Sequence, residues 1–314
     1  MRLATALAIR GPLSDVIEQA QVVDALGYES IWVPEIAGRD ALVTCALIAG
    51  AVERCGVATG IVPLPSRSPV TLAMGGAALA EATNGRFVLG VGAGHPETSR
   101  RWLGRDPLTV AGIAEHLEVV RSVLHEGQVS RAAGASLPAI EFRLRGAHPP
   151  APPPIILAAL GPRMATLAGG AASGLVLNWV TPEHVATVAM WAREGAEAAG
   201  RDPDAVEIAC YVPVCVGDPD DARRELSRQL RAYGSFGAYR RVLAACGIPE
   251  PTEDEIPDWI LDALGAHGDV AAVRAKLDAF ADGGVTLCVL APYPTGDDPW
   301  SSMMETWTAL APGG

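Results

Sequence analysis

Short apolar runs alternate with longer segments of helical periodicity along the chain, and this alternation constrains the fold more than any other feature. Apolar runs that are each followed by an amphipathic helix indicate parallel strands whose crossover connections are the helices. Glycine and proline separate the segments, as Gly11, Pro12 and Pro34 do near the start. Strands are expected over 3–9, 29–33, 57–62, 87–91, 155–159, 175–177, 206–216 and 285–290, and helices over 13–26, 40–52, 69–82, 109–125, 163–171, 182–199, 219–232, 270–281 and 299–310.

Eight strand and helix units in 314 residues predict one (β/α)8 TIM barrel over 1–314, with its site at the carboxyl ends of the strands. An open doubly wound sheet is the alternative. It is disfavoured because no G-x-G-x-x-G follows the first strand, and the glycines Gly90, Gly92 and Gly94 follow the fourth. Two segments rich in Gly and Pro, about 127–154 and 234–257, are expected to be rim insertions that wall the pocket, and their few aromatic residues predict no large stacking cage.

Composition excludes several classes of function. The net charge of −12 and a pI of about 4.9 argue against binding to nucleic acid or to an anionic membrane surface. No apolar stretch is long enough to span a bilayer, and the first residues resemble a strand more than a signal peptide. The six cysteines form no C-x-x-C pair, which predicts reduced thiols in a cytoplasmic protein without a metal site.

The stretch from Gly85 to Glu97 combines a buried strand with a glycine loop that ends in a histidine and a carboxylate. Glycines at a strand end allow close approach of the backbone, either to a ligand or simply in a tight turn. His95 and Glu97 are candidates for acid–base chemistry, although a loop histidine is often merely exposed. Glu35 follows the second strand, and Asp40 after it is as well explained as a helix cap.

Two further positions suggest ligand contacts. The sequence Leu160-Gly161-Pro162-Arg163 starts a helix, whose free N–H groups and positive dipole end, with the added guanidinium, suit an anion such as a phosphate. An ordinary helix start explains the same residues. Gly60 lies within a β-branched strand, which indicates a bulge, a close ligand or simple packing.

Five segments in this order resemble the luciferase-like monooxygenase superfamily, and most of all its coenzyme F420-dependent branch, similar to methylenetetrahydromethanopterin reductases. They are YESIWVPE at 28–35, GRDAL at 38–42, ATGIV at 58–62, GRFVLGVGAG at 85–94 and AALGPRM at 158–164. The resemblance runs from residue 1 to about 230 and resumes near 270. It implies an F420-dependent oxidoreductase with the deazaflavin ring in the barrel mouth, and by the same resemblance a homodimer formed through early helices.

The resemblance also implies site residues. A non-prolyl cis peptide between Gly60 and Ile61 would support the ring, Thr59 would bond to its edge, and Gly161 to Met164 would bind phosphate. The expected cofactor-binding residues are Asp40, Thr59, Gly60, Ile61, Gly92, Gly94, Ala159, Leu160, Gly161, Pro162, Arg163, Met164, Asn178 and Trp179, and the expected catalytic residues are His95, Glu35 and Glu97.

One departure bears on the direction of the reaction. Many relatives place a histidine base directly after the acid at the end of the second strand, whereas Ile36 follows Glu35 here. This favours reduction of a C=C, C=N or C=O bond of a small substrate by reduced F420, with His95 or Glu97 giving the proton. An FMN-dependent monooxygenase of the same fold and a non-catalytic flavin-binding barrel are the alternatives. Trp102 and Tyr233 are candidate lid residues.

Overall fold

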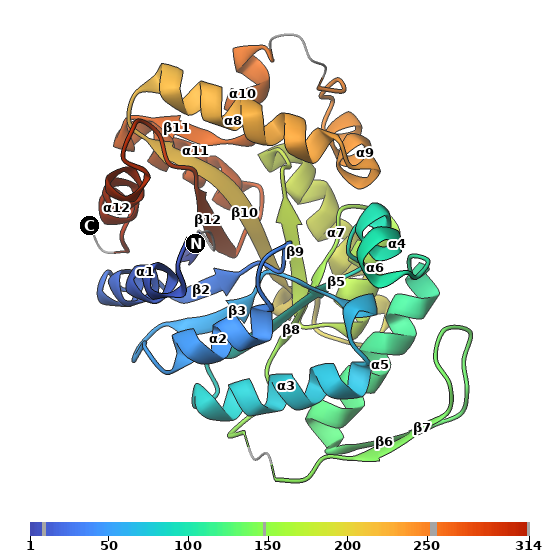
Figure 1. Ribbon diagram of the computed structural model, residues 1–314. Coiled ribbons are helices and arrows are strands. Elements are labelled where there is room, and N and C mark those ends of the chain that lie inside the picture. Colours follow the sequence, from blue (N-terminus) through green and yellow to red (C-terminus); the bar gives the residue numbers. More distant parts are fainter. Residues whose placement is uncertain (8–10, 147–148, 252–255, 313–314) are drawn as a thin grey trace.

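The computed structural model describes residues 1–7, 11–146, 149–251 and 256–312, and within them eight parallel strands close into a barrel (Figure 1). Each barrel strand pairs with two neighbours, and β12 pairs with both β10 and β1 to close the ring. The predicted (β/α)8 barrel is therefore confirmed. The barrel strands are β1 (Arg2–Ala6), β2 (Ser30–Val33), β3 (Gly56–Thr59), β5 (Phe87–Gly92), β8 (Ile155–Ala158), β9 (Gly174–Asn178), β10 (Glu207–Val216) and β12 (Leu287–Pro292).

Helices surround the barrel, and most begin where the sequence predicts (Figure 1). Side chains of Asp, Ser or Thr cap many of them; Thr181, for example, accepts a hydrogen bond from the backbone N–H of His184 at 3.3 Å. The surrounding helices are α1 (Leu13–Ala25), α2 (Ala41–Ala49), α3 (Pro69–Ala82), α5 (Val110–Glu126), α6 (Pro162–Ala171), α7 (Pro182–Ala198), α8 (Pro219–Gly234), α11 (Val270–Asp282) and α12 (Pro299–Ala309).

Several shorter elements accompany these, and one of them was expected, because the strand-like piece predicted at 140–144 is β7. Gly and Pro between 234 and 257 suggested irregular chain, yet that region begins with a helix, α9, because Tyr239, Val242 and Leu243 lie on one buried face. The first strand, expected over 3–9, ends at Ala6 in the structure, and residues 8–9 lie outside the described part of the chain. The additional elements are β4 (Val62–Pro63), η1 (Leu64–Ser66), α4 (Pro96–Leu103), β6 (Gln128–Arg131), β7 (Ile140–Arg143), η2 (Pro203–Ala205), α9 (Gly237–Ala245), α10 (Asp258–Leu264) and β11 (Ala266–Gly268).

The two insertions pack on different parts of the barrel, and the expectation that both wall the pocket stays a prediction. The first holds the β6–β7 hairpin, which projects from the body in Figure 1. It follows α5, which runs back toward the strand starts, and its last residue bonds there: Pro154 O accepts from Leu89 N at 2.9 Å. The second insertion brings Phe236 and Tyr239 to His95 and Asn178 at the carboxyl ends of the strands.

The barrel interior is filled by aliphatic side chains and two large aromatic ones. Trp32 of β2 and Tyr211 of β10 meet edge to face, with ring centroids 5.9 Å apart and planes at 89°. A separate and larger core lies between the strands and the helices. The buried interior set is Ala4, Ala6, Trp32, Ala58, Ile156, Val176, Ala209, Leu287 and Val289.

Candidate active site

The expected site residues gather at the carboxyl ends of the barrel strands, as parallel topology requires. Glu35 follows β2, Gly60 follows β3, and His95 follows β5. Gly161 and Asn178 lie at the ends of β8 and β9. The structure therefore brings residues from five separate sequence regions to one end of the barrel.

The peptide bond between Gly60 and Ile61 is cis, as the family resemblance implied. Gly60 N donates to Val33 O at 2.7 Å, and Gly60 O accepts from the Tyr211 hydroxyl at 3.2 Å. A Cβ at this position would lie 1.8 Å from that hydroxyl oxygen. A glycine is needed here because Tyr211 fills the barrel directly beneath the bulge.

Thr59 is engaged within the barrel wall, and its expected bond to the ring edge stays a prediction. Thr59 is 0% exposed, and its hydroxyl donates to Gly90 O at 2.7 Å, which links β3 to β5. The glycines of β5 likewise serve close packing of the chain itself. A Cβ at Gly90 would lie 1.9 Å from Thr59 O, and one at Gly92 would lie 2.8 Å from Ile61 Cδ1.

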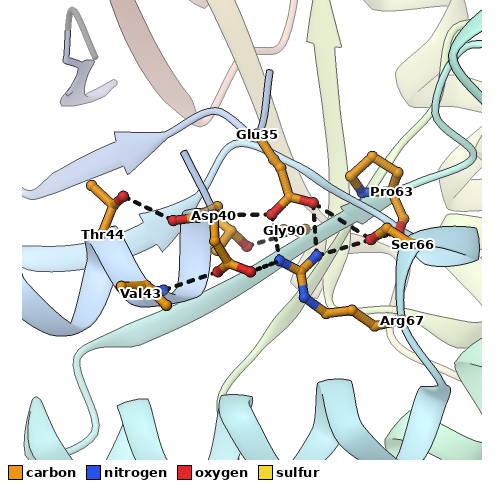
Figure 2. Close-up of polar contacts among 10 residues, drawn as sticks. Glu35, Asp40, Val43, Thr44, Pro63, Ser66, Arg67 and Gly90 are labelled. Atoms are coloured by element: carbon orange, nitrogen blue, oxygen red, sulfur yellow. Dashed lines mark hydrogen bonds and ion pairs between the residues drawn. The ribbon is translucent and has the colours of Figure 1, made fainter. Parts of the chain in front are cut away.

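Glu35 is held in a cluster of hydrogen bonds and ion pairs with Arg67 and Asp40 (Figure 2). Arg67 Nη1 and Nη2 each lie 2.7 Å from one carboxylate oxygen of Glu35, and Nη2 also pairs with Asp40. Ala41 N and the Ser66 hydroxyl donate to the same carboxylate at 3.1 and 3.4 Å. Both oxygens of Glu35 are therefore engaged within the protein.

The same cluster fixes protonation states. Asp40 caps α2, accepting from Val43 N at 3.0 Å, so the capping interpretation is confirmed. Partial burial acts to raise the pKa of Asp40, but the bonds from Val43 N and Arg67 outweigh it and lower that pKa. The hydrogen bond to Glu35 raises the pKa of Arg67. The cluster ties the loop after β2 to the segment after η1.

His95 is enclosed by aromatic side chains from the second insertion. Its ring stacks on Phe236 with centroids 4.0 Å apart and planes at 14°, and Tyr239 lies 5.7 Å away. These contacts bring α9 beside α4, as Figure 1 also shows. Burial lowers the pKa of His95, against a smaller raising effect of Glu97, which is exposed.

The aromatic enclosure extends to β9 and β12, which corrects the expectation of no stacking cage. Trp179 lies 5.4 Å from Tyr233 and 6.4 Å from Tyr293, and Tyr233 lies 4.8 Å from Tyr239. Sequence reasoning missed this cluster because its members are far apart in the chain; Tyr233 alone was predicted near the mouth. Trp102, the other candidate lid residue, is 57% exposed.

Asn178 and Trp179 are fixed by this enclosure. Asn178 Nδ2 donates to the Tyr239 hydroxyl at 2.9 Å. Trp179 is 1% exposed and has a positive φ of 55°, which is uncommon for a bulky residue and typical of functional sites. Its Nε1 has no hydrogen-bond partner among the described residues.

The start of α6 keeps the features of an anion site. Gly161 precedes the helix, and in the described structure no side chain caps its first N–H groups. Arg163 is exposed there, and a Cβ at Gly161 would meet no atom within 4 Å in the same part of the chain. Ala159 is 1% exposed and contributes its backbone, whose N–H bonds to Val176 O. Leu160 and Met164 are half-buried beside this turn.

These features define a barrel enzyme that binds a cofactor. The carboxyl ends of its parallel strands carry a bulge, a glycine loop, an enclosed histidine and an uncapped helix start. The sequence model described as luciferase-like monooxygenase matches residues 1–287. The chain belongs to this family.

Two curated relatives span most of the chain. The 5,10-methylenetetrahydromethanopterin reductase of Methanolobus tindarius is 24% identical over 314 residues, covering 91% of this chain and 92% of that protein. The F420-dependent hydroxymycolic acid dehydrogenase of Mycobacterium tuberculosis is 27% identical over 281 residues, covering 85% of this chain and 77% of that protein.

Solved structures show the same fold with different cofactors. An F420-dependent secondary alcohol dehydrogenase in complex with an F420–acetone adduct has a TM-score of 0.82 and 18% identity, covering 98% of this chain and 97% of that chain. The oxygenating constituent of 3,6-diketocamphane monooxygenase from Pseudomonas putida, in complex with FMN, has a TM-score of 0.78 and 18% identity, covering 99% and 96%.

Proposed function

We propose that this protein is an F420-dependent oxidoreductase that transfers a hydride between the coenzyme and a small organic substrate, in the direction of reducing a C=C, C=N or C=O bond. The observation that carries the proposal is the uncapped start of α6 with Arg163, at the same end of the barrel as the Gly60–Ile61 bulge. The F420-dependent dehydrogenase among the relatives supports the choice of coenzyme.

The residues present fit such a coenzyme. The free N–H groups of Arg163 and Met164, the Arg163 guanidinium and the open space at Gly161 suit a phosphate. Gly60 and Ile61 form the wall on which a flat ring would rest, with Gly92 packed against Ile61, whereas Gly94 lies against Pro63. When bound, the coenzyme supplies or accepts the hydride.

The protein's own part in the reaction is the proton and the orientation of the reactants. A ring nitrogen of His95 is the proposed proton donor, with Glu97 on the first turn of α4 as the nearest acid in sequence. Because burial lowers the pKa of His95, proton donation should weaken as the pH rises through that lowered value. For Glu35 we propose a positioning role through Arg67, since both of its oxygens are bonded.

The competing function is an FMN-dependent monooxygenase, which the FMN-bound neighbour and the description of the family favour. Titration of the apo-protein by fluorescence, separately with F420 and with FMN, separates the two. Saturable binding of F420 alone is the expected result. Preference for FMN would overturn the proposal. If the protein binds a cofactor but shows no turnover, and His95→Asn changes nothing, it would be a non-catalytic flavin carrier.

A homodimer is part of the proposal. The outer faces of α2 and α3, which pack against each other, expose Val43 (60%), Leu47 (42%) and Met74 (46%). Such a cluster of apolar side chains suits contact with a second copy. No helix among the described residues is long and apolar enough to cross a membrane.

A further inference from the structure

A pocket of about 550 Å³ opens at the end of the barrel opposite the candidate active site. Its walls are the first residues of the barrel strands, including Ser30 of β2, Phe87 of β5 and Glu207 of β10. Its volume lies within the range of about 300–1,000 Å³ typical of ligand pockets. At about 30 Å³ per water-sized group, it holds on the order of 15–20 non-hydrogen atoms.

The floor of this pocket is apolar and closed. Trp32, Val88, Ile156 and Leu287 line it and belong to the barrel interior. Trp32 packs on Tyr211, whose hydroxyl bonds to Gly60 O beneath the bulge. These two aromatic side chains separate the pocket from the barrel mouth, so a molecule bound at one end does not occupy the other.

The rim of the pocket carries three arginines, Arg2, Arg54 and Arg86. Arg2 is neutralised, because it pairs with Glu29 at 2.8 Å and with Glu207. Arg54 and Arg86 form no ion pair within the described residues, although their side chains are anchored on carbonyl groups: Arg54 on Asp24 O at 2.6 Å and Arg86 on Cys55 O at 3.4 Å.

Arg54 and Arg86 both line the pocket beside Cys55. Arg54 directly precedes Cys55 in the chain, and Arg86 Nε donates to Cys55 O at 3.4 Å. Two fixed guanidinium groups beside an apolar floor are complementary to a carboxylate attached to an apolar body. The carboxylates of Glu29 and Glu207, which also line the pocket, disfavour a second negative charge.

We propose that this pocket is a second binding site, for a small organic monoanion whose carboxylate lies between Arg54 and Arg86 and whose apolar body packs on Trp32 and Val88. The site is independent of the proposed function at the mouth. It would hold a carboxylic acid of the size of a short aryl-alkanoate.

The test is isothermal titration calorimetry of the whole protein with 4-phenylbutyrate. One site with a dissociation constant on the order of 0.1–1 mM is expected for a ligand of this size. The neutral 4-phenylbutanamide should bind at least about tenfold more weakly, a comparison that needs no variant. Arg86→Gln should weaken binding of the acid by a similar factor, and Arg163→Gln at the opposite end should not change it.

Three results would overturn the inference: no saturable binding up to about 10 mM, equal binding of the acid and the amide, or unchanged affinity in both Arg86→Gln and Arg54→Gln. Repeating the titration with saturating F420 distinguishes the two sites. An unchanged affinity supports the second site, whereas competition would place the acid in the mouth. If F420 does not bind, the proposed function is refuted, but the comparison of acid and amide still tests the second site.

Discussion

Replacement of Gly90 by alanine tests the packing that shapes the candidate active site. The new Cβ would lie 1.9 Å from Thr59 O, 3.0 Å from Thr59 C and 3.3 Å from Ile61 Cγ2. Real Cβ atoms essentially never come within 3.0 Å of another group, so β3 and β5 must separate by about 1 Å. The obstacle is backbone and cannot be relieved by turning a side chain.

The expected cost follows from two terms. Overpacking a well-packed interior costs about 1–3 kcal/mol, and weakening the Thr59–Gly90 hydrogen bond adds about 0.5–1.5 kcal/mol. A loss of roughly 2–4 kcal/mol in the free energy of unfolding should lower Tm by roughly 3–6 °C in a protein of this size. Because Thr59 adjoins the Gly60–Ile61 bulge, affinity for F420 should fall at least about tenfold as well.

Circular dichroism during heating and fluorescence titration with F420 measure these two effects. The matched control is Gly38→Ala, since Gly38 is exposed, has no positive φ and has nothing within 4 Å of its would-be Cβ among the described residues. Its Tm should stay within about 2 °C of the parent value. A Gly90→Ala protein with the parent Tm would refute the reasoning, because the clash would then have been absorbed without cost.

Three further predictions concern single side chains. Arg67→Met should lower the free energy of unfolding, measured by urea denaturation, by about 2–4 kcal/mol, because it removes the ion-pair partner of Glu35, whose side chain is only 14% exposed. The double variant Arg67→Met with Glu35→Leu should recover part of this loss. His95→Asn should reduce the turnover rate by about 10²–10⁴ with F420 affinity nearly unchanged, and an equal rate would exclude His95 as the proton donor. Leu47→Lys should convert a dimer to a monomer in light scattering, whereas Met190→Lys on α7 should not.

The barrel was predictable from sequence because each strand and helix unit carries its own signal. Apolar runs, helical spacing and terminating glycines are local, and parallel topology then fixes which ends of the strands meet. The turn from Gly161 to Arg163 could be predicted as a helix start for the same reason. Elements that depend on packing against distant residues, such as α9, could not be predicted in this way.

In the candidate site, too, local features were predictable from the sequence and long-range contacts were not. Gly90 and Gly92 predict a close approach but not what approaches, and the structure shows that it is the chain itself at Thr59 and Ile61. Arg67 carries no motif, so its pairing with Glu35 becomes visible only when the segment after β4 folds back beside β2. A long-range ion pair leaves no signal in one sequence, since either partner alone resembles an ordinary surface charge.

The stacking of Phe236 on His95 leads to a last prediction about pH. The pKa of His95 is lowered because burial disfavours the imidazolium, so Phe236→Ala should raise it toward the ordinary value of about 6.5. A histidine with a lowered pKa in the folded state contributes stability that is present above about pH 6.5 and is lost as the pH falls through the folded pKa.

In Phe236→Ala this loss of stability at acid pH should therefore be smaller, and any rate that depends on protonated His95 should extend to higher pH. Titration of the histidine ring protons by nuclear magnetic resonance, assigned with His95→Asn, measures the pKa directly. Trp102→Ala is the control, because Trp102 is 57% exposed on the neighbouring α4. An unchanged or lower pKa in Phe236→Ala would mean that the aromatic cover is not what lowers the pKa of His95, and the second insertion would then lose its proposed influence on the proton donor.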